Sequence, residues 1–544
     1  MRFRFAVFAI LALAALLAGR SLEAPGLYYD EAVQARPALE LATGQVRAAP
    51  LPGSHSVWVG GTRVPLMTQP YMGALKSQVL ALPLAISGPD VRVLRAVTLA
   101  IALFGIAGIA CFARRAFGSA MALITTGLLA SDPSVLLLAR HDWGSFSISL
   151  LLRAAVLFFG FRFFESRRPW HLLLAGFALG LGFYNKVDFG IFVVAVVAGL
   201  LLAFPRECLR LVREQRVAVV SGLGAVALGI GPLWLHLRGV LSRPGAFSHE
   251  GEMAAKFETL WTTFDGSHFH RLMQSGGLFD DLGGIGDAAS GPFVVVLIFA
   301  ATWAAFRAFA PGGSKADRGT LRFLLVANAF GIATYFLLPG GERIHHAQNL
   351  VPLPQLLVAG VLVHLAGIGS GARRGRVPRA LAAAGVAIFV ALQVGVYEET
   401  RRDFSASGGK GRWSNAIADL ARDLAAEPLG VTSLDWGFQE PLAFYGTAAS
   451  LDEAHWRILE PLRRGRAWRQ RGDAQQLYLL HLPPFDRSGF GSPFLEAARA
   501  WVSEGFGQIR FHRDGDGEVA FVSVRFAGDH LIHYDGRFRI ERLR

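Results

Sequence analysis

Two adjacent carboxylates, Asp30 and Glu31, follow shortly after the first long apolar segment of the chain. A charged side chain close to a membrane is costly unless it has a partner or a task. A carboxylate in such a position can act as a general base, which removes the proton from an attacking group. The alternative is that both residues only favour the start of a helix, whose dipole attracts negative charge. The pair is therefore a candidate catalytic centre with a simpler structural alternative.

Further residues that can donate or accept charge stand at the ends of later apolar segments. Asp142 is a third acid, and its structural alternative is an ion pair with Arg140. The other side chains of this kind are Lys76, Lys186, Arg343, His345 and His346. Each cation could instead simply extend toward the membrane surface. The two histidines could bind phosphate or a divalent metal ion, although one metal rarely takes two adjacent histidines.

These residues are separated by segments that predict transmembrane helices. A helix needs roughly 17 to 25 predominantly apolar residues to cross the hydrocarbon core. Eleven such segments lie near residues 4–19, 93–113, 119–138, 145–164, 169–184, 187–204, 217–237, 291–309, 320–338, 347–368 and 379–397. Residues 75–86 are apolar but too short to span, which predicts a helix at the interface. The sequence thus predicts a polytopic α-helical membrane protein with about 11 transmembrane helices.

Composition and charge agree with this prediction. Of 544 residues, 52% are apolar and 17% charged, and the mean hydropathy is +0.39, whereas soluble domains are about 25% charged. The net charge of +13 is spread over short clusters between apolar segments, which argues against nucleic-acid binding. Nineteen arginines and lysines fall in the segments on the same side of the membrane as the N-terminus. Seven fall in the loops on the opposite side that follow the first such loop. This bias predicts an inner (plasma) membrane protein with a cytoplasmic N-terminus.

Three stretches would then lie outside the cytoplasm: loop 20–92 with the acidic pair, loop 238–290, and the tail 400–544. A helix is predicted up to Ala426 in the tail, followed by strands at 430–436, 477–482, 508–513 and 518–526. Asp514–Gly517 is a predicted hairpin turn between the last two strands. The chain would thus consist of a membrane domain at 1–399 and an extracytoplasmic α/β domain at 400–544.

Several different short motifs follow one another in order along residues 1–400. They are the acidic pair, Arg92–Arg95 and Arg114–Gly118 around one apolar segment, Ser131–Pro133 before Leu138–Asp142, Tyr184–Lys186, and Arg343–His346 before Pro352 and Pro354. On this topology, the set resembles the GT-C superfamily of membrane glycosyltransferases. The similar branch contains protein mannosyltransferases and lipid A aminoarabinose transferases, and is glycosyltransferase family 39-like.

The resemblance implies transfer of a sugar from a polyprenyl-phosphate donor to an extracytoplasmic lipid, glycan or protein acceptor, with inversion. By analogy, Asp30 is the general base, Glu31 orients or coordinates, and Asp142 is the second acid. The leaving lipid phosphate gains negative charge, which fixed cations or a divalent metal stabilise. The expected phosphate-binding residues are Lys76, Arg140, Lys186 and Arg343, and the expected metal ligands are His345 and His346.

Two other functions compete with this prediction. A membrane transporter or lipid flippase would show paired halves, broken helices and charges inside its spans. Here most ionisable residues lie at segment ends, and a large tail follows the last segment, which favours catalysis at one face. Among enzymes, an oligosaccharide or O-antigen ligase shares the lipid-linked donor but transfers a preassembled glycan.

Overall fold

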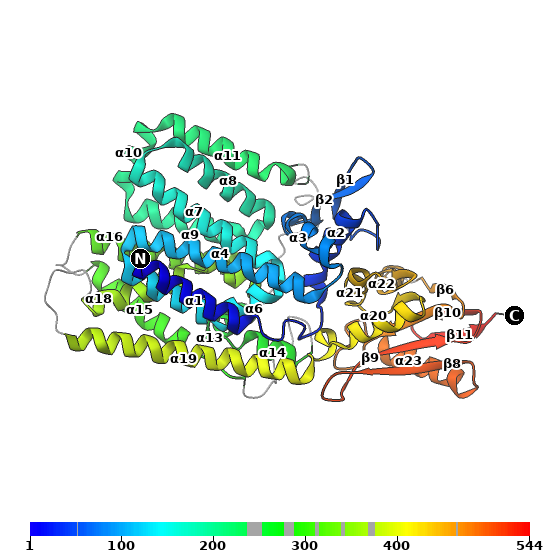
Figure 1. The fold of residues 1–544 in the computed structure, drawn as a ribbon. Helices are drawn as coiled ribbons and strands as arrows, with labels where there is room; N and C mark the ends of the chain where they lie inside the picture. The colour runs from blue at the N-terminus through cyan, green and yellow to red at the C-terminus, as the bar shows by residue number, and fades with distance from the viewer. Residues whose placement is uncertain are drawn as a thin grey trace.

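Long helices pack side by side in the computed structural model, which describes residues 1–51, 53–234, 236, 253–276, 288–309, 315–338, 343–367, 376–463 and 466–543. The bundle consists of α1 (Arg2–Ala18), α4 (Val91–Phe117), α5 (Ser119–Ser131), α6 (Pro133–His141), α7 (Phe146–Ser166), α8 (Pro169–Asn185), α9 (Gly190–Ala203), α11 (Arg216–Trp234), α15 (Phe293–Phe309), α16 (Lys315–Leu337), α18 (Leu353–Leu365) and α19 (Arg376–Ser407). The N-terminus lies at one end of the bundle and the C-terminal region at the other (Figure 1).

Short elements connect these helices. The helical ones are α2 (Tyr29–Thr43), α3 (Leu75–Ser87), η1 (Trp143–Ser145), η2 (Val187–Phe189), α10 (Pro205–Glu214), α13 (Met253–Asp265), α14 (His268–Gln274), α17 (Ile344–Ala347) and η3 (Gln348–Leu350). Strands β1 (His55–Val59), β2 (Thr62–Gln69) and β3 (Met72–Gly73) form a small sheet between α2 and α3 in the chain. We call the end of the bundle that carries α2, α3 and the C-terminal region the site end (Figure 1).

A helix lies at each of the eleven predicted apolar segments, but several are short or bent. Within the described ranges, five helices are long and apolar enough to cross a membrane, and up to eight spans result if each bent pair counts as one. The bends measure 63° between α5 and α6, 99° between α9 and α10, and 41° before α18. A proline stands at or beside each bend, at Pro133, Pro205 and Pro352. The helical, multi-span fold is confirmed, whereas the number eleven stays a prediction.

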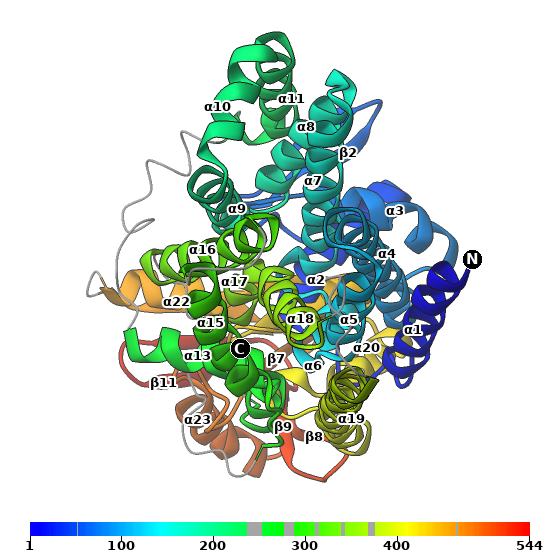
Figure 2. The same cartoon turned by 90° about the vertical axis from the view of Figure 1, so that its left-hand side faces the viewer.

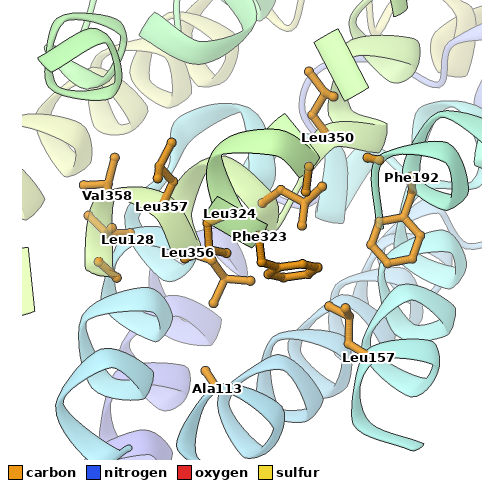
Figure 3. Close-up of a cluster of buried hydrophobic side chains, with 14 of the residues drawn as sticks. Ala113, Leu128, Leu157, Phe192, Phe323, Leu324, Leu350, Leu356, Leu357 and Val358 are labelled. Atoms are coloured by element: carbon orange, nitrogen blue, oxygen red, sulfur yellow. The ribbon is translucent and has the colours of Figure 1, made fainter. Parts of the chain in front are cut away.

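Apolar side chains from several helices meet in the bundle core. Figure 3 shows Leu356, Leu357 and Val358 of α18 packed with Leu324 of α16 and Leu128 of α5, and all five are at most 2% exposed. Close packing of this kind helps to hold membrane helices together. The core therefore fixes how the bundle helices lie beside each other.

Small residues let α8 and α11 approach closely, and the two helices form a pair at one edge of the bundle (Figure 2). A Cβ atom on Gly176 would lie 2.4 Å from the carbonyl oxygen of Gly222. A Cβ atom on Gly180 would lie 2.3 Å from the carbonyl oxygen of Val226. Glycines at such contacts allow the backbones of membrane helices to touch.

We expect Gly180→Ala to force α8 and α11 apart and to lower the unfolding temperature of the purified protein. Overpacking of this kind costs about 1–3 kcal/mol. Gly224→Ala is the matched control, because a Cβ atom there meets nothing within 4 Å. Equal unfolding temperatures for the two variants in the same detergent would contradict the close packing.

The predicted interfacial helix at 75–86 is present as α3. Its outer side exposes Val79, Leu82 and Ile86, while Lys76 and Leu80 on the other side are buried. This amphipathic pattern suits a helix that lies in the membrane surface. In the predicted loop 238–290, α13 and α14 are described, whereas residues 238–252 and 277–287 lie outside the described residues.

The C-terminal region contains the elements expected from its sequence and several more. Its helices are α20 (Ala416–Ala426), α21 (Gln439–Tyr445), α22 (Ala454–Arg463) and α23 (Gly491–Ser503), after the short η4 (Gly411–Trp413). Its strands are β4 (Gly430–Ser433), β5 (Ser450–Glu453), β6 (Trp468–Gly472), β7 (Gln476–Leu480), β8 (Gly507–Arg513), β9 (Val519–Phe526), β10 (His530–Tyr534) and β11 (Phe538–Arg542). One sheet has the order β5-β4-β7-β9-β8 and the other β11-β10-β6. The predicted hairpin between β8 and β9 is confirmed.

Candidate active site

Five short turns at the site end bring together residues that are far apart in the sequence. The turns are the start of α2, the start of α3, η1, the segment from α8 to η2, and α17. The backbone joins η2 to the turn between β2 and β3, which leads into α3, since Val187 donates a hydrogen bond to the carbonyl of Tyr71 at 3.2 Å. Gly144 in η1 lies so close to α17 and η2 that a Cβ atom would be 3.0 Å from His345 and 3.2 Å from Lys186 Nζ.

Asp30 lies in the first turn of α2 and is partly exposed. Its Oδ2 accepts a hydrogen bond from Trp143 Nε1 at 2.6 Å. Burial raises the pKa of the Asp30 carboxyl group, whereas the charges of Arg343, Lys186 and Lys76 and the bond from Trp143 lower it. Asp30 is thus a carboxylate that accepts a hydrogen bond from Trp143 and whose charged form three cations favour.

Glu31, although adjacent, has a different environment. It forms a bidentate ion pair with Arg95 of α4, with both N–O distances at 2.8 Å. Both side chains are almost fully buried. Arg95 also donates to the backbone carbonyls of Leu22, Pro25 and Gly26, which lead into α2. Glu31 therefore anchors the chain before α2 and orients it relative to α4.

Asp142 ends α6 with a left-handed backbone (φ 46°). Its Oδ2 lies 3.0 Å from Lys76 Nζ, and both side chains are 1% exposed. Its Oδ1 accepts a hydrogen bond from the backbone N–H of Ser147 at 2.6 Å. The ion pair considered from the sequence, with Arg140, is replaced by one with Lys76.

Arg140 is held by the chain before α2 and by α19. Its guanidinium donates to the carbonyl of Ala24 at 2.8 Å, to that of Ser21, and to the hydroxyl of Tyr397 at 3.2 Å. These contacts tie α6 to the chain before α2 and to α19. The structure thus gives Arg140 a bracing position, and its predicted phosphate contact stays a prediction.

Lys186 and His346 share a carboxylate that the sequence interpretation did not single out. Asp188 Oδ2 lies 3.0 Å from Lys186 Nζ and 2.7 Å from His346 Nδ1. The rings of His345 and Trp143 lie 5.2 Å apart. Within the described part of the chain, no group of three or more His, Cys, Asp or Glu residues could hold a metal ion. No metal site is therefore evident among the described residues, and His345 and His346 as metal ligands stay a prediction.

Three residues of this site were missed in the sequence: Trp143, Asp188 and Arg95. The motif Asp142-Trp143-Gly144 was visible but had no assigned meaning, and the acid at 188 stands only two residues after Lys186. Arg95 was noted as part of a motif without a partner. A search for acids and aromatic side chains next to the predicted cations would have found the first two.

The arrangement can carry out proton transfer next to an anion. Asp30 can accept a proton, and Arg343 and Lys186 are placed to stabilise negative charge that develops nearby. Asp30 and these two cations lie at the site end, where helix α3 also exposes apolar side chains.

The chain is similar to known proteins in part of its sequence and in its fold. Residues 70–234 match the family model of dolichyl-phosphate-mannose-protein mannosyltransferases. The chain is similar to the crystal structure of ArnT from Cupriavidus metallidurans bound to undecaprenyl phosphate, with a TM-score of 0.53, 13% identity, and coverage of 95% of this chain and 97% of that chain. The archaeal oligosaccharyltransferase AglB from Archaeoglobus fulgidus, in complex with an inhibitory peptide and a dolichol-phosphate, gives a TM-score of 0.45 at 14% identity over 82% of this chain and 64% of that chain.

No curated protein matches the chain. The family match over residues 70–234 and the fold shared with ArnT nevertheless confirm the predicted resemblance to the GT-C superfamily of membrane glycosyltransferases, in its protein mannosyltransferase and lipid A aminoarabinose transferase branch.

Proposed function

We propose that this protein transfers a sugar from a polyprenyl-phosphate donor to an acceptor outside the cytoplasm, with Asp30 as the general base. The observation that carries the proposal is the position of Asp30, which accepts a hydrogen bond from Trp143 and whose pKa is lowered by the charges of Arg343, Lys186 and Lys76. The family match names a dolichyl-phosphate-mannose donor, and the ArnT structure contains undecaprenyl phosphate. Both support a lipid phosphate as the carrier of the sugar.

The proposed reaction is a single displacement at the anomeric carbon. Asp30 removes the proton of the acceptor as its oxygen attacks that carbon from the face opposite the phosphate. The bond from the carbon to the phosphate oxygen breaks, and its electron pair stays on the polyprenyl phosphate. Arg343 and Lys186 stabilise the added negative charge. One displacement inverts the configuration of the sugar.

Sidedness follows from the charge bias. Helix α10, with Arg206, Arg210 and Arg213, lies at the N-terminal end of the bundle (Figure 1), and clusters of this kind stay in the cytoplasm. The site end would then lie outside. We expect a reporter that is active only outside the cytoplasm to be active when fused after Arg544. Activity of a cytoplasmic reporter there would overturn this orientation.

The pH dependence of transfer gives a second prediction. A general base works when deprotonated, so transfer is lost as the pH falls through its pKa. Arg343 is the strongest of the cations that lower the pKa of Asp30. We therefore expect the loss in Arg343→Met to begin at a higher pH than in the wild type. Profiles of kcat/KM against pH, with Arg92→Met as an exposed control, measure the shift. An unchanged acid limb would contradict the role of Asp30.

The direct test uses the purified protein in lipid nanodiscs. Radiolabelled polyprenyl-phosphate sugars are offered with lipid, glycan or peptide acceptors, and the label is followed by chromatography. We expect label to leave the donor and appear on one acceptor class. A donor that stays intact with every acceptor would refute the proposal. Movement of the intact donor across liposome membranes would favour the transporter instead.

A further inference from the structure

We propose that Trp413, in the linker between α19 and the C-terminal region, positions the catalytic carboxylate Asp30 through Tyr28 and Trp143. This inference rests on the function proposed above. It makes the linker after the last bundle helix part of the active site, although Trp413 touches neither Asp30 nor a substrate.

The linker and the segment before α2 are joined along their backbones. The N–H of Gly26 donates to the carbonyl of Trp413 at 2.6 Å and to that of Gly408 at 3.1 Å. A Cβ atom on Gly26 would lie 2.3 Å from the carbonyl oxygen of Ser414. The two segments therefore lie in direct contact, with no side chain between them.

Aromatic rings continue this contact toward Asp30. The rings of Trp413 and Tyr28 are stacked, with centroids 3.8 Å apart and planes at 5°. Trp143 meets Tyr28 and Trp413 edge-on, with both centroid distances at 5.9 Å. All three rings are at most 2% exposed. The indole N–H of Trp143 then donates to Asp30 at 2.6 Å.

The C-terminal region holds Trp413 in place through its neighbour Arg412. The Arg412 guanidinium donates to Asp435 at the end of β4 at 2.6 Å and to the carbonyl of Trp436 at 3.2 Å. Asp435 also lies 2.8 Å from His481 Nδ1. Both charged side chains of the Arg412–Asp435 pair are at most 2% exposed. The stack thus connects a rigid β-strand end to the proposed base.

Removal of the Trp413 ring would leave a void beside Tyr28 and Trp143, because buried side chains are closely packed and relax only in part. Trp143 could then turn, and the hydrogen bond that orients Asp30 would be lost. A catalytic group that is displaced by about 1 Å can cost on the order of 10²-fold in rate. The loss should appear in kcat, since the donor-binding cations are untouched.

The test compares Trp413→Ala, Trp413→Phe and Trp468→Ala in the nanodisc transfer assay, with unfolding temperatures measured for each. Trp468 is the matched control, because it is a buried tryptophan of β6 in the separate core of the C-terminal region. We expect Trp413→Ala to lose on the order of 10²-fold in kcat with little change in the donor KM. Trp413→Phe should recover only part of kcat, because a phenyl ring can stack on Tyr28 but leaves part of the indole volume empty, so that Trp143 is held less firmly. Trp468→Ala should lose stability but keep its kcat.

A second readout separates positioning from a purely structural role. The bond from Trp143 lowers the pKa of Asp30, so its weakening in Trp413→Phe should move the acid limb of the kcat/KM profile to higher pH. The charges that face Asp30, from Arg343, Lys186 and Lys76, are unchanged in this variant.

Three outcomes would overturn the inference: wild-type kcat in Trp413→Ala, an equal loss of kcat in Trp468→Ala, or, where Trp413→Ala does not fold, an unshifted limb in Trp413→Phe. If the wild type transfers sugar and Asp30→Asn does not, such an outcome refutes only the role of Trp413. If the wild type transfers no sugar, the proposed function itself fails.

Discussion

Asp30→Asn should reduce sugar transfer by roughly 10²–10⁴-fold in kcat, the usual contribution of acid–base catalysis. Asparagine keeps the size of the side chain, and its amide oxygen can still accept the hydrogen bond from Trp143. It cannot take the proton of the acceptor. The variant should therefore fold and bind the donor like the wild type, and lose only turnover. Initial rates with saturating donor measure the effect.

Glu23→Gln is a suitable control for this experiment. Glu23 is an exposed carboxylate in the same loop, seven residues before Asp30 in the sequence, and its loss should leave transfer unchanged. The structural alternative, in which Asp30 only favours the start of α2, predicts near wild-type transfer by Asp30→Asn. If Asp30 only favours the start of α2, its replacement by Asn removes one charge near the helix N-terminus. This should lower the stability of the protein by a few tenths of a kcal/mol up to about 1 kcal/mol. Near wild-type turnover would thus refute the catalytic assignment.

Arg95→Met should be the most destabilising single change near the site. The Arg95 side chain is fully buried, and its removal leaves the Glu31 carboxylate without its bidentate partner. Three backbone carbonyls before α2 also lose their donor. Breaking a buried ion pair from one side costs about 3–5 kcal/mol. The unfolding temperature in detergent should fall clearly.

Two further variants make the measurement specific. Arg92→Met removes a cation from the same helix, but Arg92 is 68% exposed and pairs with the nearby Asp90 at the surface, so the effect should be at most about 1 kcal/mol. Arg95→Met combined with Glu31→Gln should recover part of the loss, because no unpaired charge remains buried. Equal unfolding temperatures for Arg95→Met and Arg92→Met would show that the pair does not anchor α2.

Much of the architecture could be predicted from the sequence because it depends on local composition. A continuous run of apolar residues long enough to span a bilayer is helical, because lipid offers no hydrogen bonds and a helix satisfies its backbone N–H and C=O groups within the segment. The strand-like segments at 508–513 and 518–526, with the turn Asp514–Gly517 between them, likewise predicted the strands β8 and β9. The ends of these segments then showed where acids and cations gather.

The spacing of residues along the chain gave incomplete information on the site. Asp30 and Glu31 are adjacent, but successive helix positions point in different directions, so Glu31 pairs with Arg95 while Asp30 faces the cations. Asp142 pairs with Lys76, 66 residues away, rather than with nearby Arg140. No local pattern could give these partners.

The sequence by itself determined that this is a helical membrane protein with charged residues collected at segment ends, because hydrophobic length and charge placement are properties of single segments. Only the tertiary structure decided which acid is anchored and which is available. It also decided that Trp143 lies beside Asp30 and that Trp413 stacks on Tyr28 next to Trp143. The physical reason is that these contacts join residues more than one hundred positions apart, and such contacts depend on how whole helices pack rather than on any local preference.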